Sequence, residues 1–230
     1  MKKIILAPSI MCANFRNLES EVLSLIEAGA DILHIDIMDG TFVPNFAMGL
    51  QDLACILEIT KNKEILVDVH LMISNPIDYI ELFCNMGVDI IYIHPEVDLH
   101  PIRTLQKIQS FNVKAGIAIS PNIALENVQE LFPYTDYVMM MTVSPGFAGQ
   151  TYLASMDEKI DKLVKIRDEK YHFPIAVDGA IARETIMRLF RVGVEIFVLG
   201  TSALFQKTEI YSKIIADIRE ENQNENCDSK

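Results

Sequence analysis

Short apolar runs rich in Val, Ile and Leu alternate with longer segments of helical periodicity, and this alternation constrains the fold more than any other feature. We expect each run to be a strand of a parallel sheet, because strands buried on both faces carry nearly continuous apolar sequence. The predicted strands span Ile4–Pro8, Ile32–Met38, Ile65–Met72, Ile90–His94, Lys114–Ile119, Tyr137–Val143, Ile175–Asp178 and Ile196–Gly200.

The segments between these strands have the spacing of amphipathic helices. In Asn17–Ala28 the apolar residues recur on one stripe, and Gly29 follows as a C-terminal stop. Pro76–Met86 and Arg183–Val192 are also expected to be helical, and each ends before a glycine that leads into the next strand. The chain therefore repeats one join, in which a helix stops at glycine and a strand begins.

Eight strand–helix units predict an α/β fold of the (β/α)8 type, a TIM barrel. A doubly wound open sheet is the alternative. No linker rich in Pro, Gly or Ser interrupts the 230 residues, which favours a closed ring and a single domain. We expect the barrel domain to cover residues 1–219, and the polar segment 220–230 to form a frayed C-terminal tail.

Charge and composition exclude several classes of partner. The formal net charge of −12 argues against nucleic acid and anionic membrane surfaces, which require clustered Lys and Arg. No stretch approaches the roughly 20 apolar residues of a membrane span. The four cysteines are widely spaced and contain no C-x-x-C pair, as expected for reduced thiols of a cytoplasmic protein.

Ionisable side chains gather where the predicted strands end, and the carboxyl ends of barrel strands carry the active site. His34 and Asp36 are two residues apart and so share one face of a strand, while His70 and Asp178 come from the third and seventh strands. Two imidazoles and two carboxylates suit one divalent ion such as Zn2+, Mn2+, Co2+ or Fe2+. Buried polar groups that satisfy one another are the alternative.

Glycine-containing loops follow the last three predicted strands. They are Pro145–Gln150, Asp178–Ala180 and Gly200–Ser202. Glycine lets backbone amides approach an anion, and the loops after strands 7 and 8 are the usual phosphate site of such barrels. Ordinary turns are the alternative for each loop alone, but three neighbouring loops of this kind favour phosphate.

Two further residue types bear on the chemistry. Arg16 and Arg183 are the basic residues expected near strand carboxyl ends, so no lysine is placed for a Schiff base. Met38, Met72 and Met141 lie near strand ends, where they either fill the core or line the site and keep water from a reactive intermediate.

Six motifs, in the correct order, resemble those of the ribulose-phosphate 3-epimerase family over Ile4–Phe205. They are A-P-S at Ala7–Ser9, H-I-D-I-M-D-G-T-F-V-P-N at His34–Asn45, D-V-H-L-M at Asp68–Met72, P-G-F-A-G-Q at Pro145–Gln150, V-D-G at Val177–Gly179 and G-T-S-A-L-F at Gly200–Phe205. The resemblance implies a barrel of the ribulose-phosphate-binding type. It also implies a metal-dependent enzyme that inverts C3 of a ketose phosphate by two-base proton transfer through an enediolate.

The resemblance also implies roles for individual residues. His34, Asp36, His70 and Asp178 match the family's metal ligands, and Asp36 and Asp178 match its acid/base pair. The residues that match its substrate contacts are Ser9, His70, Gly146, Phe147, Ala148, Gly149, Gly179, Ala180, Gly200, Thr201 and Ser202. A homo-oligomer is a further expectation from the family.

Four departures from the commonest family pattern bear on the substrate. They are Ala148, Ala180, the H-P-E at His94–Glu96 and the G-T-S form of Gly200–Ser202. These features resemble the D-allulose-6-phosphate 3-epimerase branch, so the sequence favours conversion of D-allulose 6-phosphate to D-fructose 6-phosphate. The alternative is conversion of D-ribulose 5-phosphate to D-xylulose 5-phosphate in the pentose phosphate pathway.

A sugar-phosphate sensor and a metal-dependent hydrolase are less favoured than an epimerase. A sensor does not need both aspartates, and nothing in the sequence indicates a scissile bond for a hydrolase.

Overall fold

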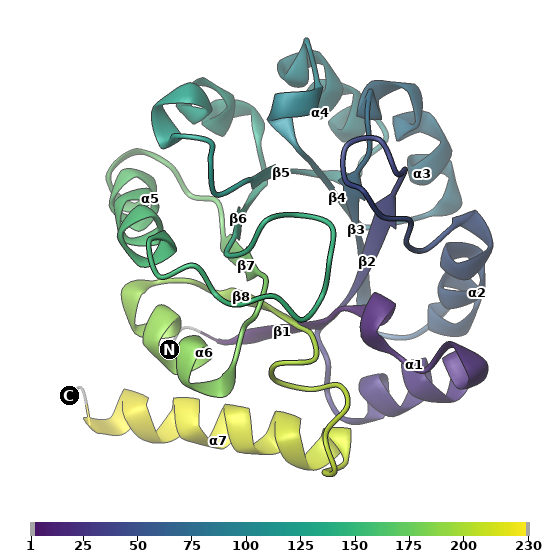
Figure 1. The fold of residues 1–230 in the computed structure, drawn as a ribbon, viewed down its shortest axis with the longest axis vertical. Helices are drawn as coiled ribbons and strands as arrows, with labels where there is room; N and C mark the ends of the chain where they lie inside the picture. Colours follow the sequence, from purple (N-terminus) through teal and green to yellow (C-terminus); the bar gives the residue numbers. More distant parts are fainter. Residues whose placement is uncertain (1–2, 229–230) are drawn as a thin grey trace.

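Eight parallel strands form a ring surrounded by helices in the computed structural model, which describes residues 3–228 (Figure 1). The strands are β1 (Ile5–Pro8), β2 (Ile32–Met38), β3 (Leu66–Met72), β4 (Ile90–Ile93), β5 (Lys114–Ile119), β6 (Tyr137–Met141), β7 (Ile175–Asp178) and β8 (Ile196–Leu199). The α-helices are α1 (Leu18–Glu27), α2 (Leu50–Thr60), α3 (Ile80–Met86), α4 (Pro101–Ser110), α5 (Met156–Lys170), α6 (Arg183–Val192) and α7 (Tyr211–Asp228). The predicted TIM barrel is confirmed.

Element boundaries differ from the predicted ones by one or two residues at several ends. The sixth strand was expected to reach Val143 but ends at Met141, where its pairing with Asp178 of β7 is the last in that register. The helix expected over Pro76–Met86 is divided, because a 3-10 turn over Pro76–Asp78 precedes α3.

The C-terminal helix α7 runs to Asp228 and so includes most of the segment predicted as a polar tail. Lys230 and its neighbour lie outside the described residues. The division of the chain at residue 219 and the fraying of the tail stay predictions. Among residues 3–228, no helix is long and apolar enough to cross a membrane.

The core has two layers because both faces of the sheet are buried. Every residue of β2 is buried, as predicted for a parallel strand. The larger layer lies between the strands and the helices, and a smaller one fills the barrel interior with side chains such as Ala7, Met139 and Val198. Within that interior Tyr92 occupies the space that Gly116 leaves, because a Cβ on Gly116 would lie 2.4 Å from the Tyr92 ring.

The ring closes between β1 and β2, which are joined differently from the other strand pairs. An isolated bridge pairs Ser9 with His34 near the carboxyl ends. At the opposite end, the Leu6 amide donates to the Asp31 carboxylate, and the Asp31 amide donates to the Leu6 carbonyl. This β1–β2 seam is therefore held by the Ser9–His34 bridge near one end of the barrel and by the Leu6–Asp31 hydrogen bonds near the other.

Candidate active site

Four ionisable side chains meet at the carboxyl end of the barrel. The parallel register of β2 and β3 sets His34 beside Asp68 and Asp36 beside His70. Asp178 reaches the same place from the end of β7. One ligand atom from each of His34, Asp36, His70 and Asp178 lies within 4.8 Å of all the others. The structure thus brings together all four residues expected to bind a metal.

The spacing of these atoms fits a single divalent ion. Oδ1 of Asp36 lies 3.3 Å from Nε2 of His34 and 3.3 Å from Nδ1 of His70, and Oδ2 of Asp178 lies 3.8 Å from that Nδ1. Two ligands about 2.1 Å from one ion are about 3.0–3.5 Å apart, so the two Asp36–histidine distances fit, and the Asp178–His70 distance is slightly longer. Nε2 of His34 and Nδ1 of His70 are buried without a hydrogen-bond partner, which a metal would supply.

The other ring nitrogen of each histidine has a partner. Nδ1 of His34 lies 2.5 Å from Oδ1 of Asp68, a fully buried contact. Nε2 of His70 lies 2.9 Å from Nε2 of His94, which follows β4. Metal-binding histidines usually have such a partner on the distal nitrogen, and it sets the orientation and tautomer of the ring.

Without an ion, charge and burial move the pKa values of the carboxylates in opposite directions. Burial would raise the pKa of Asp36, but the neighbouring His34 and His70 outweigh burial and lower it. Burial and the charge of Asp36 raise the pKa of Asp178 to about 6. Burial would lower the pKa of His34, yet the carboxylates of Asp68 and Asp36 raise it well above its usual value. The two aspartates are therefore inequivalent, as an acid and a base must be.

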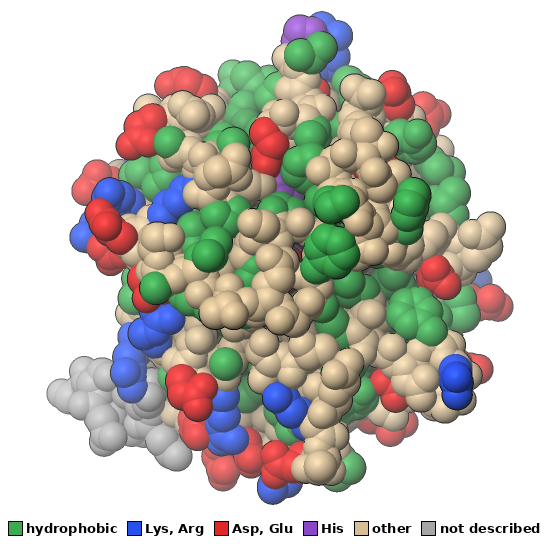
Figure 2. All heavy atoms as spheres, viewed as in Figure 1, with side chains coloured by type: hydrophobic (Ala, Val, Ile, Leu, Met, Phe, Trp, Pro, Cys, Tyr) green, Lys and Arg blue, Asp and Glu red, His purple; other side chains and the backbone are tan. Residues whose placement is uncertain are grey.

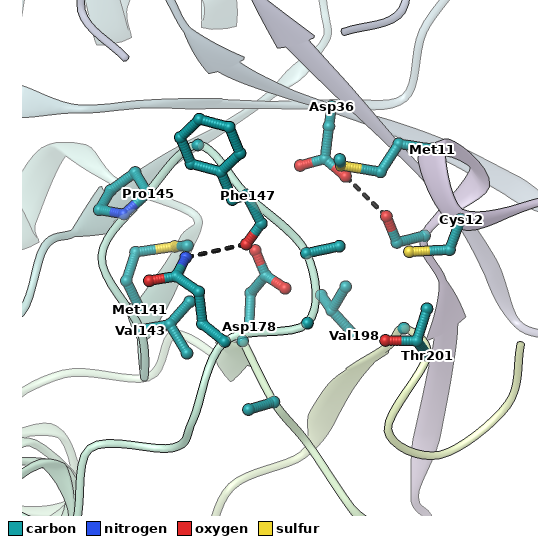
Figure 3. A pocket seen from close by; sticks show the side chains of 18 of the residues that line it. Met11, Cys12, Asp36, Met141, Val143, Pro145, Phe147, Asp178, Val198 and Thr201 are labelled. Atoms are coloured by element: carbon teal, nitrogen blue, oxygen red, sulfur yellow. Dashed lines mark hydrogen bonds between the residues drawn. The ribbon is translucent and has the colours of Figure 1, made fainter. Parts of the chain in front are cut away.

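A pocket opens directly above this cluster and contains about 540 Å³ of empty space, part of it open to solvent. Asp36 and Asp178 face the space from different strands (Figure 3). The Ser9 hydroxyl donates to Oδ2 of Asp36 at 2.6 Å. Met11 and Cys12, from the turn after β1, complete the wall beside Asp36.

Most of the residues expected to contact substrate line this pocket. Those lining it are Ser9, Gly146, Phe147, Ala148, Gly149, Gly179, Ala180, Gly200, Thr201 and Ser202, and the expected methionines Met38, Met72 and Met141 lie beside them. His34 and His70 are fully buried and are not part of the pocket lining. The position of His70 therefore suits its expected metal role better than its expected contact with the sugar phosphate.

The three glycine-containing loops follow the neighbouring strands β6, β7 and β8, and all three line one side of the pocket. Gly179 has φ +115°, and a Cβ there would lie 2.5 Å from the Val143 side chain, so only glycine fits. Ala180 has φ +52°, a left-handed conformation that is uncommon for alanine. This backbone arrangement leaves main-chain groups near the pocket, as an anion site requires.

The mouth of the barrel carries few charged side chains. Figure 2, viewed as in Figure 1, shows acidic and basic side chains mainly at the periphery, and hydrophobic side chains together with backbone and other uncharged side chains over the centre. The sequence placed no lysine near a strand carboxyl end, but Lys159 of α5 reaches the carbonyls of Ser120 and Pro121, just after β5. Lys159 is not part of the pocket lining, and its bonds to carbonyls hold that loop.

Sequence reasoning missed Asp68, the distal-nitrogen role of His94, and the wall residues Met11 and Cys12. Asp68 precedes His70 by two residues on β3, so the alternation that paired His34 with Asp36 also points Asp68 inward. Nothing in the local pattern marks Met11 or Cys12, because both belong to a short 3-10 turn.

Comparisons with known proteins agree with the geometry. A model of the ribulose-phosphate 3 epimerase family matches residues 5–205. The chain is 37% identical over 215 residues to ribulose-phosphate 3-epimerase of Bacillus subtilis, covering 93% of this chain and 97% of that protein. It is 38% identical over 221 residues to ribulose-phosphate 3-epimerase of Synechocystis, covering 95% and 94%.

Solved structures of lower identity share the fold alone. A mutant tryptophan synthase α-subunit from Pyrococcus furiosus has a TM-score of 0.68 at 16% identity, covering 97% of this chain and 100% of that one. The 3-hexulose-6-phosphate synthase of Salmonella typhimurium has a TM-score of 0.67 at 15% identity, covering 96% and 99%.

Proposed function

Because the chain belongs to the ribulose-phosphate 3-epimerase family, we propose that it interconverts D-ribulose 5-phosphate and D-xylulose 5-phosphate. Membership makes it an isomerase of the carbohydrate epimerase kind. The observation that carries the proposal is the pair Asp36 and Asp178, which face one pocket above the cluster of candidate metal ligands.

The choice of pentose phosphate reverses the preference taken from the sequence. Ala148, Ala180 and the other departures favoured D-allulose 6-phosphate, but the relatives that match over more than nine-tenths of the chain are named ribulose-phosphate 3-epimerase. Ala148 and Ala180 both line the pocket, so they can affect the fit of a substrate without changing the chemistry.

The two aspartates carry the proton transfers. Inverting a carbon beside a carbonyl requires removal of its proton on one face and return of a proton on the other. Asp36 and Asp178 come from β2 and β7 and approach the pocket from different sides, so each can serve one face of a flat enediolate (Figure 3). The Ser9 hydroxyl, bonded to Oδ2 of Asp36, holds that carboxylate in place.

His34, Asp36, His70 and Asp178 would hold the divalent ion. When bound, the ion supplies an electrophile that stabilises the negative charge developing on the substrate oxygens. Met38, Met72 and Met141 form an apolar lining that keeps bulk water from the carbanion-like carbon. The loops after β6, β7 and β8 would hold the phosphate through backbone amides.

The test is a measurement of kcat/KM for D-ribulose 5-phosphate and D-allulose 6-phosphate on protein reconstituted with Zn2+, Mn2+, Co2+ or Fe2+. We expect the pentose phosphate to be favoured at least tenfold, which corresponds to about 1.4 kcal/mol of transition-state stabilisation. Preference for allulose 6-phosphate would show the proposed substrate to be wrong. Absence of turnover of both sugars with every metal would refute the epimerase and favour a binding role.

A further inference from the structure

The two buried histidines of the metal cluster differ in what their distal nitrogens contact. His34 contacts the carboxylate of Asp68 directly, whereas His70 contacts another imidazole, that of His94. Beyond His94, Nδ1 lies 3.3 Å from Oε1 of Glu96 and 3.2 Å from Oγ of Ser120. A chain of hydrogen bonds therefore runs from the metal cluster to Glu96, a residue that the mechanism does not use.

The chemistry of these groups fixes which atom donates and which accepts in every hydrogen bond between Glu96 and His94. An ionised carboxylate only accepts hydrogen bonds, so the hydroxyl of Ser120 donates its single proton to Oε1 of Glu96. The Ser120 oxygen can then only accept from Nδ1 of His94. Both neighbours of that nitrogen are acceptors, so Nδ1 of a neutral His94 carries the hydrogen and Nε2 carries the lone pair.

The same reasoning continues to His70. Because Nε2 of His94 accepts, Nε2 of His70 must donate across the 2.9 Å contact. The lone pair of neutral His70 then lies on Nδ1, the atom that is buried without a hydrogen-bond partner beside Asp36. The tautomer reached from Glu96 is thus the one that a metal requires of His70.

We propose that Glu96 is a positioning residue for metal binding, which acts through His94 to hold His70 in the tautomer whose Nδ1 can ligate. The inference deepens the proposed function and rests on its metal site, not on the identity of the sugar. His94 is fully buried, and the ring of Phe42 packs against it at a centroid distance of 4.8 Å. Nδ1 of His94 is therefore shielded from bulk water in the folded protein, and its neighbours are the carboxylate of Glu96 and the hydroxyl of Ser120.

The elements around Glu96 hold it for this role. It lies in the 3-10 turn Pro95–Val97 that directly follows β4 and His94. Its partner Ser120 is buried at the end of β5, and Lys159 binds the carbonyl of Ser120 at 3.1 Å. The carboxylate therefore contacts side chains that follow two strands, and α5 holds the second of them through the Ser120 carbonyl.

Metal affinity of the apoprotein tests the proposal without any turnover. Competition with a chromophoric chelator gives the Kd for Zn2+ and Mn2+ in wild type, E96Q, E96D and D98N. The glutamine side chain of E96Q can turn its amide N–H2 toward Nδ1 of His94, which would exchange the donor and acceptor roles along the hydrogen bonds to His70. We therefore expect this variant to bind the metal about 10- to 100-fold more weakly. The E96D variant keeps an acceptor-only carboxylate and should bind more tightly than E96Q.

Asp98 is the matched control, because it lies in the same loop and, among the contacts described, its side chain accepts a hydrogen bond only from the His100 amide. We expect D98N, with the same loss of charge, to bind metal within about twofold of wild type. Wild-type affinity in E96Q, or equal weakening in D98N, would overturn the proposal. If wild type itself binds no divalent metal, the proposed function fails instead.

A second measurement holds even if E96Q does not fold. Long-range 1H–15N correlation spectra of zinc-loaded wild type, labelled at histidine, report the protonated nitrogen of each ring. We expect hydrogen on Nδ1 of His94 and on Nε2 of His70. Hydrogen on Nε2 of His94 would show that the chain runs in the opposite direction and would refute the role of Glu96.

Discussion

Oδ1 of Asp68 lies 2.5 Å from Nδ1 of His34, and both side chains are buried. The contact turns Nε2 of His34 toward Asp36. Asp68 therefore orients the metal ligand His34 without itself being one of the four candidate ligands. Replacing Asp68 with Asn keeps an acceptor in place but removes the charge. We expect Asp68→Asn to weaken Zn2+ or Mn2+ binding by about tenfold or more, measured by chelator competition. Unchanged affinity would contradict this role, and Asp161→Asn, an exposed change of the same charge, is the control.

Replacing either Asp36 or Asp178 with Asn should remove one of the two proton-transfer groups. We expect kcat on D-ribulose 5-phosphate to fall by about 10²–10⁴-fold or more in each variant. Circular dichroism should show an unchanged fold, because Asn is isosteric with Asp. Incorporation of solvent deuterium at C3, followed by NMR, checks proton abstraction separately. Near-normal turnover by either variant would exclude the two-base scheme.

Removal of the metal should abolish activity and lower the melting temperature. Nε2 of His34 and Nδ1 of His70 lose their partner when the ion leaves, while both remain buried. A ligand at 100 times its Kd stabilises the folded state by about 2.7 kcal/mol, so dialysis against a strong chelator should produce a measurable drop. Addition of Mn2+, Zn2+, Co2+ or Fe2+ should restore both properties. Equal melting temperatures with and without metal would contradict a metal in this buried site.

Asp31 should make the stability of the protein depend on pH below neutrality. Burial would raise its pKa, but hydrogen bonds from Lys3 and the Leu6 amide and the charge of Arg219 outweigh burial and lower it. A carboxyl with a lowered folded pKa stabilises above its unfolded pKa of about 4, and this contribution disappears as the pH falls through the folded value. We expect Asp31→Asn to cost about 1–3 kcal/mol at pH 7 and much less at pH 3.

Urea unfolding at the two pH values measures this difference. An equal loss at pH 7 and pH 3 would show that the contribution of Asp31 is not electrostatic. Lys3→Met serves as a comparison, because Lys3 is largely exposed and solvent screens its ion pair with Asp31, so we expect a smaller loss than in Asp31→Asn.

Much of the fold follows from local pattern, because parallel strands buried on both faces leave a clear apolar record. The same alternation predicted that His34 and Asp36 share a face, and β2 shows both buried. Asp178 could be assigned to the site only once a barrel was predicted. It lies far along the chain from His34, and closure of the ring brings the two together. The end of the sixth strand was misplaced because apolar sequence continues to Val143, beyond the last residue of β6, Met141.

The contacts that sequence could not provide depend on stagger between elements and on long-range approach. In the β3–β4 register His70 pairs with Tyr92, and the ring of His94, two residues further along, contacts that of His70; no spacing along the chain encodes this register. Lys159 reaches the loop after β5 from a helix almost 40 residues further along the chain. Both contacts require the assembled barrel.

The β1–β2 seam has a consequence for how activity returns after denaturation. Near the carboxyl ends of the strands, the seam is held by the bridge between Ser9 and His34, and the Ser9 hydroxyl also donates to Asp36. The same residues therefore close the ring and build the site. A chain that has formed its other strand pairs but not this one has no complete ligand set. During refolding, catalytic activity should therefore return later than secondary structure, and its return should report the closure of the barrel between β1 and β2.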